Sequence, residues 1–377
     1  MSADTPKFKD GPIRFAVVGL GHIAQAAVLP AFENAENAVL TALVSRDDEK
    51  REKLGERYGV EHLYHYSDYD ELLARDIVDA VYIALPNHLH CDYTVRAARA
   101  GVHVLCEKPM AVTEDECRKM IDVCDENGVH LMIAYRLHFE AANLEAIEAA
   151  RRGDLGELRY FVSAFSQDVK GEDIRLFPLE KGGGTVYDMG VYCINAARYL
   201  FGAEPVEVVA FSESKEGDER FEDCDEMTTA ILRFPENRIA TFTSSFGAAD
   251  ISTYQLVGTK GELRMDPAYR YATNLRYEIE SEGESREKTF PKRDQFGPQL
   301  VYFSNCIIQD ERPEPDGYEG LADVRIVQAV YESAETGRPI MLESVKQPKR
   351  PDISQKITRP GFEKPEEIKA SSPKEDG

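Results

Sequence analysis

The first part of the chain alternates short apolar runs with longer segments in which apolar and charged positions recur at helical spacing. Apolar, β-branched runs of this length are typical of buried strands, and the segments between them predict helices. The expected strands cover residues 13–18, 39–44, 78–85, 103–106 and 129–134. Because helical segments separate most of these strands, the pattern predicts an α/β fold with a doubly wound parallel sheet over residues 13–134.

The pattern changes after residue 134. An amphipathic helix is expected over 143–152, and apolar runs then follow one another with short polar connections. These expected strands are 159–166, 206–212, 227–234, 239–246, 253–258 and 262–265. Strands that follow strands predict an antiparallel sheet, here broken by a helix over 186–201 and followed by a helix over 320–336. We therefore expect residues 135–343 to form an α+β domain with a large open, mainly antiparallel sheet.

Both ends of the chain lack this periodicity. Residues 344–377 contain five prolines and few apolar residues, so this tail cannot bury enough surface to fold alone. We expect it to be disordered or to lie as an extended arm on another subunit. The N-terminal tail, residues 1–12, has no apolar segment that resembles a signal, and no apolar run is long enough to span a membrane. The expected location is the cytoplasm, without membrane contacts.

Composition limits the class of partner. The chain has 45 basic and 68 acidic residues, a formal net charge of -23, and no basic stripe that would bind nucleic acid. This acidity suits either ordinary solubility or a salt-adapted host. The seven cysteines are scattered without a CxxC pair, which predicts reduced thiols and argues against a zinc site, so no metal is expected.

A glycine-rich turn, Gly19-Leu20-Gly21-His22-Ile23-Ala24, connects the first expected strand to the first helix. Gly19 permits the tight turn, Gly21 leaves room between backbone and ligand, and the small Ala24 lets the helix lie close to the strand. Free N–H groups and the positive end of the helix dipole meet at this helix start, where a pyrophosphate fits. The turn predicts a dinucleotide-binding Rossmann domain.

The end of the second strand is where such a domain selects its cofactor. An acidic residue there would bind the ribose hydroxyls of NAD, whereas Ser45 and Arg46 offer a hydroxyl and a fixed cation that suit the 2′-phosphate of NADP. NADP is therefore expected, with NAD as the alternative. In the other interpretation Arg46 is simply solvated and Asp47 is a helix N-cap.

The third strand stops at Pro86, so the chain leaves the sheet at the edge where ligands of parallel sheets collect. Asn87 and His90 are then expected near the nicotinamide half of the cofactor. The alternative is a turn asparagine and an ordinary histidine at a helix start.

The fourth strand, 103–106, is followed at once by Glu107, Lys108 and Pro109. A lysine held at this edge of the sheet can hydrogen-bond a substrate hydroxyl and help to remove its proton. The alternative is a surface Glu–Lys pair in a turn.

Asp188 and Tyr192 are four residues apart in the expected helix 186–201 and so share one face. Tyr192 carries a proton that it can exchange with a substrate. Asp188 could also close a capping box with Thr185. The glycines at 182–184 suit either a loop that borders a ligand or a flexible hinge.

Several ordered motifs resemble the glucose-fructose oxidoreductase / inositol dehydrogenase (Gfo/Idh/MocA) family. Within it, they are most similar to glucose-fructose oxidoreductase and to NADP-dependent aldose dehydrogenases. The motifs are VVGLGHIA, ALVSR, AVYIALPNHLH, HVLCEKPM, LMIAYRLH, GGGTVYDMGVYCINAARYLFG, LVGTKGELRMDP and GLADVRIVQAVYESAETGRP.

The resemblance implies that Lys108, Asp188 and Tyr192 line the reacting carbon, with Lys108 and Tyr192 sharing the proton transfer. It implies a substrate site formed by Lys108, Tyr135, Arg175, Asp188 and Tyr192. The residues expected to bind the cofactor are Gly19, Gly21, His22, Ile23, Ser45, Arg46, Lys50, Tyr66, Pro86, Asn87, His90, Glu107, Lys108 and Arg136. Tyrosine at position 192, where many relatives have histidine, favours an aldose.

The expected function is an NADP-dependent sugar oxidoreductase. It would transfer hydride between C1 of a cyclic aldose of the glucose or xylose class and nicotinamide, giving a lactone, or catalyse the reverse reduction. Two alternatives are a reductase of another keto-sugar or polyol, and a non-catalytic regulator that senses a dinucleotide or sugar. A homodimer or homotetramer through the C-terminal sheet is expected.

Overall fold

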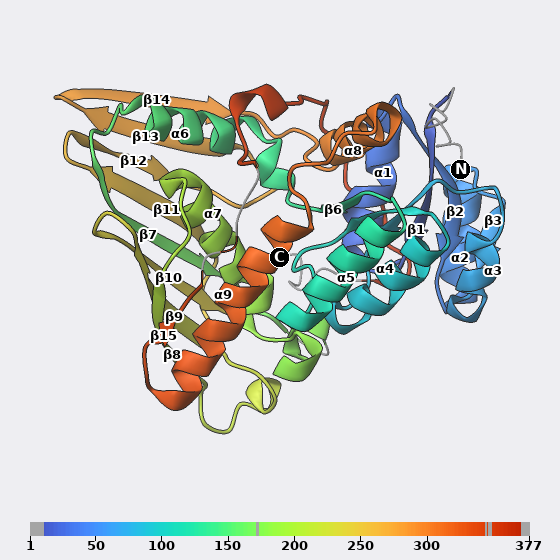
Figure 1. The fold of residues 1–377 in the computed structure, drawn as a ribbon, viewed down its shortest axis with the longest axis horizontal. Coiled ribbons are helices and arrows are strands. Elements are labelled where there is room, and N and C mark those ends of the chain that lie inside the picture. Colours follow the sequence, from blue (N-terminus) through green and yellow to red (C-terminus); the bar gives the residue numbers. More distant parts are fainter. Residues whose placement is uncertain (1–10, 171–172, 344, 346–348, 371–377) are drawn as a thin grey trace.

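Two β-sheets lie side by side in the computed structural model, which describes residues 11–170, 173–343, 345 and 349–370 (Figure 1). The first sheet has the strand order β3-β2-β1-β4-β5-β6, and every paired strand in it is parallel. Its strands are β1 (Ile13–Val18), β2 (Ala38–Val44), β3 (His62–Tyr64), β4 (Ala80–Ile83), β5 (His103–Cys106) and β6 (Leu131–Ile133). This is the predicted doubly wound α/β sheet, and only the short strand β3 was not expected.

Alternate residues of β1 enter two separate cores, because successive side chains of a strand point to opposite faces. Ala16 and Val18 pack with one group of helices, and Phe15 and Val17 pack with the other. The first group is α3 (Tyr69–Leu73), α4 (His90–Arg99) and α5 (Glu114–Glu126); the second includes α1 (Leu29–Ala31) and α2 (Asp48–Tyr58). The helix expected after the glycine turn consists of a π-helical turn (Ala24–Val28), α1 and a 3-10 turn (Phe32–Asn34).

The second sheet has nine strands in the order β14-β13-β12-β11-β7-β10-β9-β8-β15. Only β7 and β10 pair in parallel, so the sheet is mainly antiparallel, as predicted. Its strands are β7 (Leu158–Ser166), β8 (Glu207–Glu213), β9 (Met227–Phe234), β10 (Arg238–Ser245), β11 (Ile251–Gly258), β12 (Gly261–Met265), β13 (Leu275–Ser281), β14 (Glu284–Phe290) and β15 (Ile340–Met341).

In the described part of the chain, helices cover one face of this second sheet (Figure 1). The covering helices are α6 (Ala141–Arg152), α7 (Val191–Phe201) and α9 (Gly317–Thr336), whose apolar residues share a core with the inward side chains of the sheet. The opposite face exposes large apolar side chains from adjacent strands: Tyr160, Val162, Phe211, Met227, Ile231, Ile239 and Ile251.

The longest elements of the second half that were not predicted are the strands β13 and β14 and the helix α8. The hairpin β13–β14 was missed because its outward positions are charged on both strands and its apolar residues are few. Helix α8 (Gly297–Gln309) was also missed. It returns to the first sheet, where Phe303 packs near Phe15 with ring centroids 6.4 Å apart.

The described part of the C-terminal tail, residues 349–370, is named here the C-terminal arm (Figure 1, red). It lies on its own chain, so neither a disordered tail nor an arm on another subunit describes these residues. Arg350 forms an ion pair with Glu204 near the second sheet, and Ile368 hydrogen-bonds Gln25 beside the first sheet. Most of the N-terminal tail, residues 1–10, lies outside the described residues, and the predicted domain bounds stay predictions.

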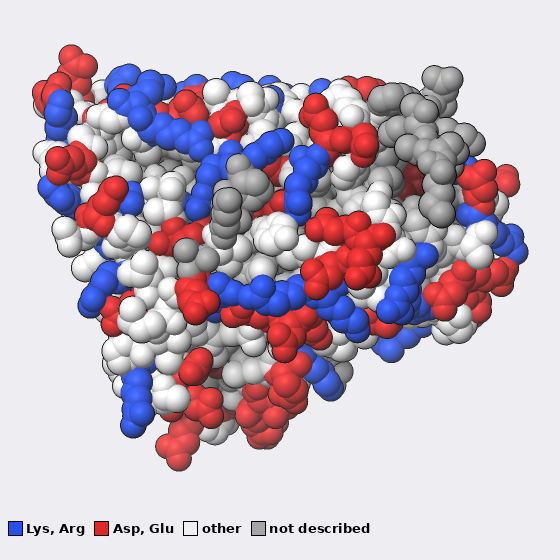
Figure 2. All heavy atoms as spheres, viewed as in Figure 1, with Lys and Arg blue, Asp and Glu red and all other residues white. Residues whose placement is uncertain are grey.

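Acidic and basic side chains are interspersed over the face shown in Figure 2, and acidic side chains gather along its lower edge. All seven cysteines are buried and unpaired, which fits the expected reduced thiols. Among the described residues, none of the helices is both long and apolar enough to cross a membrane.

Candidate active site

The glycine turn has the geometry that a dinucleotide requires. Gly19 adopts a left-handed φ of +97°, and a Cβ there would meet the Ala84 carbonyl oxygen at 2.4 Å, so no other residue fits. Gly21 differs because a Cβ on it would meet nothing within 4 Å. The backbone beside the helix start therefore borders open space, as contact with a pyrophosphate needs. Ile23 precedes the π-helical turn, and the His22 side chain turns to Glu367 at 2.8 Å.

The structure brings together the residues predicted for the 2′-phosphate. Ser45 is buried at the end of β2, Arg46 is exposed, and the Tyr66 hydroxyl neighbours both. Burial lowers the pKa of Lys50, and the nearby Arg46 cation lowers it too. Asp47 is the N-cap of α2, accepting from the Lys50 backbone, as the alternative interpretation held.

Two residues after β4 were predicted to lie near the nicotinamide, and of these Asn87 is partly exposed whereas His90 is buried. Asn87 lies in a 3-10 turn after Pro86 and donates to the Gly182 carbonyl at 2.6 Å, so it joins the two halves of the molecule. His90 is fully buried, with its ring nitrogens 3.0 Å and 2.8 Å from the carbonyls of Pro109 and Leu85. The prediction that His90 binds the cofactor is therefore wrong, because both nitrogens already hold backbone groups. It is an ordinary structural histidine.

Lys108 reaches across to the second half of the chain from the turn after β5. Its Nζ lies 2.8 Å from the Asp188 carbonyl oxygen and 3.2 Å from Asp188 Oδ1, and its side chain is only 11% exposed. The neighbouring Glu107 turns away and accepts from the Tyr82 hydroxyl at 2.7 Å. The alternative of a surface Glu–Lys pair is wrong for this reason.

Asp188 is held between two cations. Its second carboxylate oxygen accepts from Arg175 Nε at 2.7 Å, and Asp173 holds the same guanidinium at 3.0 Å. Burial alone would raise the pKa of Asp188, but Arg175 and Lys108 outweigh it and lower the pKa to about 2. Asp188 is therefore an anion at neutral pH.

The predicted capping box at residue 185 does not form. Thr185 is fully buried, and its backbone and hydroxyl both bond to Asp225 instead. The helix expected over 186–201 begins with a π-helical turn, Val186–Gly190, before α7. π-Helical turns are frequent at functional sites, and this one carries Asp188.

The glycines at 182–184 form a tightly packed loop. A Cβ on Gly183 would lie 1.7 Å from the Phe177 carbonyl oxygen, and Gly182 accepts from Asn87. This packing supports the interpretation of a loop held at the border of a site, and a flexible hinge does not fit it.

Tyr192, in the first turn of α7, lies beneath the Lys108 ammonium. The Nζ atom is 4.5 Å from the centroid of the tyrosine ring, within cation–π range. Arg136 Nη2 donates to the phenol oxygen at 3.3 Å, and the Arg136 guanidinium carbon is 5.1 Å from the centroid of the same ring. Two cations thus flank one phenol.

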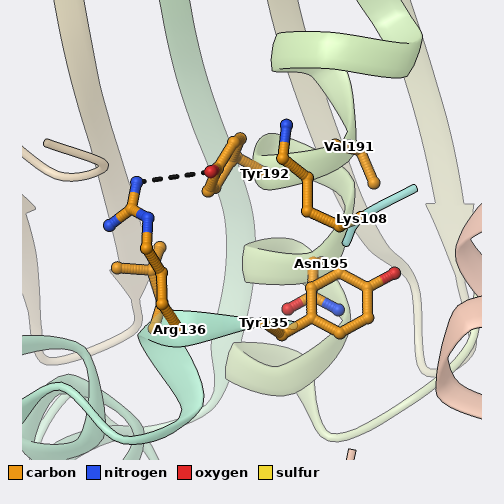
Figure 3. A pocket seen from close by; sticks show the side chains of 7 residues that line it. Lys108, Tyr135, Arg136, Val191, Tyr192 and Asn195 are labelled. Carbon is orange, nitrogen blue, oxygen red and sulfur yellow. Dashed lines mark hydrogen bonds between the residues drawn. The ribbon is translucent and has the colours of Figure 1, made fainter. Parts of the chain in front are cut away.

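These residues line a small cleft between the two sheets, whose lining is Lys108, Tyr135, Arg136, Leu137, Val191, Tyr192 and Asn195 (Figure 3). Lys108 and Arg136 approach Tyr192 from different sides, whereas the Tyr135 hydroxyl points away from Tyr192. Burial and the carboxylates of Asp323 and Glu319 raise the pKa of Tyr135 well above its usual value. The Tyr135 hydroxyl therefore keeps its proton, and the cleft is lined by its ring.

Arg136 was expected at the cofactor, and its contact with Tyr192 was not predicted. Arg136 is 5% exposed and hydrogen-bonds Gln295 and the Tyr269 carbonyl. Both partners belong to irregular segments that lack periodicity, so no pattern could have indicated them. Asn195 was also missed, although it is four residues after Val191 on the same helix face.

Electrostatics favour an ammonium at position 108. Burial alone would lower the pKa of Lys108, but the neighbouring Tyr192 and the carboxylates of Asp188 and Glu107 together raise it above its ordinary value. The geometry can therefore stabilise a negative charge that develops on an oxygen in the cleft, which is what deprotonation of a substrate hydroxyl produces.

Comparison with family models gives two matches. Residues 13–135 match the model described as "Oxidoreductase family, NAD-binding Rossmann fold", and residues 143–264 match the "GFO/IDH/MocA C-terminal domain". Together they span most of both sheets.

Two curated relatives are similar over most of their length. The NADP(+)-dependent D-xylose 1-dehydrogenase of Haloarcula marismortui is 34% identical, over 89% of this chain and 94% of the relative. The dTDP-3,4-didehydro-2,6-dideoxy-alpha-D-glucose 3-reductase of Actinomadura kijaniata is 30% identical, over 86% and 96%.

Two solved structures share the fold. Aldose-aldose oxidoreductase from Caulobacter crescentus, in complex with glycerol, is 37% identical with a TM-score of 0.84, covering 88% of this chain and 100% of that one. A 3-ketoreductase from Actinomadura kijaniata, in complex with TDP-benzene and NADP, is 29% identical with a TM-score of 0.76, covering 86% and 98%.

Proposed function

This chain belongs to the GFO/IDH/MocA oxidoreductase family, and from that premise we propose that it is an NADP-dependent sugar oxidoreductase. Its reaction exchanges hydride between C1 of a cyclic aldose, of the xylose or glucose class, and nicotinamide. The observation that carries the proposal is the convergence of Lys108, Asp188 and Tyr192 on one cleft between the sheets. The xylose dehydrogenase and aldose oxidoreductase relatives support the substrate class.

The glycine turn and the residues at the end of β2 fit NADP. Gly19 and Gly21 would hold the pyrophosphate, and Ser45, Arg46, Lys50 and Tyr66 would hold the 2′-phosphate. The support is the open space beside Gly21 and the exposed Arg46 cation next to the buried Ser45 hydroxyl. When bound, the nicotinamide supplies the hydride acceptor or donor.

The residues of this chain handle the proton. Tyr192 acts as a phenolate, which the two flanking cations stabilise; it takes the proton from the sugar hydroxyl as hydride leaves C1 for the nicotinamide, and so becomes a neutral phenol. Arg136 acts through its 3.3 Å hydrogen bond to the phenol, and Lys108 acts through its charge. Asp188, fixed by Arg175, holds the Lys108 ammonium in place.

Variants of a relative support the roles of Lys108 and Tyr192. Solved structures of the Actinomadura 3-ketoreductase include one with a lysine replaced and one with a tyrosine replaced, 84 positions apart. Lys108 and Tyr192 are separated by the same 84 positions. Equal spacing of the same two residue types supports equivalent roles.

A second candidate function is the reduction of a keto-sugar, and the Actinomadura 3-reductase relative favours it. The same lysine and tyrosine serve both directions, because a proton acceptor in oxidation becomes a proton donor in reduction. The other alternative is a non-catalytic sensor of sugar or dinucleotide, and such a sensor would not need Lys108, Asp188 and Tyr192 together.

The uncovered face of the second sheet supports a homodimer or homotetramer. Its exposed apolar residues lie on adjacent strands and so form one surface: Ile239 is opposite Tyr160 in the β7–β10 pair, and Ile231 is opposite Thr241 in the β9–β10 pair. Exposed apolar patches of this kind mark interfaces. A cytoplasmic location is proposed with it, and the seven unpaired cysteines support that location.

The test is a panel of aldoses, keto-sugars and polyols, each mixed with the purified protein and NADP or NADPH, with nicotinamide absorbance as the readout. The proposal predicts NADP reduction by pentoses or hexoses that carry a free C1 hydroxyl. Turnover of keto-sugars alone would favour the second candidate, and the absence of any turnover would favour the sensor.

A further inference from the structure

The C-terminal arm ends against the glycine turn, although the two segments are more than 340 residues apart in the sequence. Gln25 lies at the start of the helix that follows the turn and is fully buried. Its side chain donates to the Ile368 carbonyl at 3.0 Å and accepts from the Ile368 backbone N–H at 2.7 Å. The same amide nitrogen donates to Leu20 within the turn at 2.9 Å, so one side chain connects the arm to the turn.

Neighbouring contacts fix the arm on both sides of Ile368. Glu367 bonds His22 of the turn at 2.8 Å, and Arg57 of α2 donates to the Glu366 carbonyl at 2.7 Å. Ile368 is 9% exposed and belongs to the core under β1. Because a polar side chain and an apolar one are both buried here, the arm end is part of the folded structure.

Lys369 then points toward the end of β2. Its Nζ lies 3.3 Å from Asp47 and 2.8 Å from Glu49, and its side chain is about half exposed. Asp47, which Lys369 contacts, directly follows Arg46 and accepts a hydrogen bond from the Lys50 backbone N–H at 3.1 Å. Three cations, Arg46, Lys50 and Lys369, therefore gather where the 2′-phosphate of NADP is proposed to bind.

We propose that the C-terminal arm is part of the dinucleotide site: residues 366–369 form the wall at its adenosine end, and Lys369 is a specificity-determining residue that favours NADP over NAD. A 2′-phosphate is a dianion near neutral pH, and each ammonium placed beside it favours the phosphorylated nucleotide. A wall anchored by buried hydrogen bonds also slows release, because a bound nucleotide must leave past it. The inference rests on the proposed function only in that NADP is the cofactor.

The wall is tested with two shortened chains. One ends at Pro365 and lacks Glu366 to Ala370 of the control, but it keeps Ile357 and Phe362, two arm residues that pack against the core under β1. The control ends at Ala370. NADP binding is measured by calorimetry and NADP release by stopped-flow displacement, with thermal unfolding as the check on folding. The chain ending at Pro365 should release NADP about tenfold faster than the control and bind it correspondingly more weakly. Equal rates in the two folded chains, or tighter binding by the shorter one, would overturn the proposal.

Lys369 is tested by Lys369→Ala, with Lys356→Ala as the matched control because it is also an arm lysine, paired instead with Glu145. The dissociation constants of NADP and NAD are both measured. Lys369→Ala should weaken NADP about three- to tenfold and leave NAD unchanged, and Lys356→Ala should change neither. An equal effect on the two nucleotides, or none on NADP, would overturn the role of Lys369.

Neither measurement needs sugar turnover, so the two proposals can fail separately. Full activity on aldoses with an arm that has no effect on NADP contradicts only this inference. An arm effect on NADP in a protein that oxidises no sugar contradicts only the proposed reaction.

Discussion

The ammonium nitrogen of Lys108 lies 4.5 Å from the centre of the Tyr192 ring, although one residue follows a strand of the first sheet and the other begins a helix of the second layer. Because the Lys108 ammonium is largely removed from water, it stabilises negative charge on the Tyr192 oxygen more than an exposed ammonium would. The contact therefore joins the two halves of the molecule at the point where the proposed chemistry takes place.

Replacing Lys108 by Met removes this charge and keeps most of the side-chain volume. We expect turnover of the preferred aldose to fall by about 10²–10⁴-fold, the range typical of lost acid–base assistance, while NADP affinity stays within about twofold. Steady-state kinetics and calorimetry measure the two effects. Lys119→Met, at an exposed position of α5, is the control. Unchanged turnover in Lys108→Met would remove the residue from the mechanism.

Tyr192→Phe removes only the phenol oxygen. Turnover should fall by about 10²-fold or more, because no other group at this position can take the proton. The folded state loses one 3.3 Å hydrogen bond to Arg136, which contributes about 1 kcal/mol to the free energy of unfolding. Kinetics and denaturant unfolding separate the two effects. A folded Phe variant with wild-type turnover would show that the proton goes elsewhere.

The fold was largely predictable because most strands of the first sheet are predominantly apolar runs, and burial on both faces requires such runs. The hairpin β13–β14 was not, because a half-exposed sheet edge such as Glu284–Phe290 carries mostly polar residues. Within the site, Lys108 and Tyr192 stand in recognisable motifs. The contact of Arg136 with Tyr192 was not predictable, because segments distant in the sequence, around Tyr269 and Gln295, position that guanidinium.

The position of the C-terminal arm was not predictable either, because it too depends on contacts between segments distant in the sequence. Its anchors to the turn are single residues, Glu367 and Ile368, in a stretch with no periodic pattern, so local sequence favoured disorder. The His90 prediction failed for a related reason, since a sequence does not show that both ring nitrogens already face backbone carbonyls.

The low pKa of Asp188 predicts how its contribution to stability depends on pH. The pKa of Asp188 in the folded protein, about 2, is below the ordinary 3.8. The ionised carboxylate therefore stabilises the fold fully above pH 3.8, and this stabilisation is lost only as the pH falls toward 2. Asp188→Asn should therefore lower the free energy of unfolding by roughly 2 kcal/mol, equally at about pH 7 and about pH 5. Urea unfolding at both values measures this. If the variant and the wild type had equal free energies of unfolding at about pH 5, the pairing of Asp188 with Arg175 and Lys108 would be contradicted.

The cofactor preference depends on the exposed Arg46. Arg46→Asp places a carboxylate beside the proposed 2′-phosphate, so the NADP-to-NAD affinity ratio should fall by about 10²-fold, the value of one charge-assisted hydrogen bond. Arg75→Asp, at an exposed position paired with Glu71, is the control. An unchanged ratio in Arg46→Asp would mean that the 2′-phosphate binds elsewhere.

The oligomeric state is tested on the uncovered sheet face. Phe211 is 67% exposed and Ile231 is 45% exposed on neighbouring strands. The double variant Phe211→Glu, Ile231→Lys should dissociate a dimer or tetramer in light scattering, because burying two charges in an apolar interface is costly. Ile353→Lys, at an exposed apolar residue outside the sheet, should not. A wild-type monomer would contradict the proposed interface.

Hydride transfer from C1 can be followed directly with an aldose that carries deuterium at that carbon. The labelled pentose or hexose that reacts best is incubated with the protein and NADP, and the reduced nucleotide is analysed by mass spectrometry. We predict one deuterium per reduced nucleotide in the wild-type protein and a loss of this product in Lys108→Met. Reduced nucleotide without deuterium would show that hydride comes from another carbon, and would contradict the assignment of the reaction to C1.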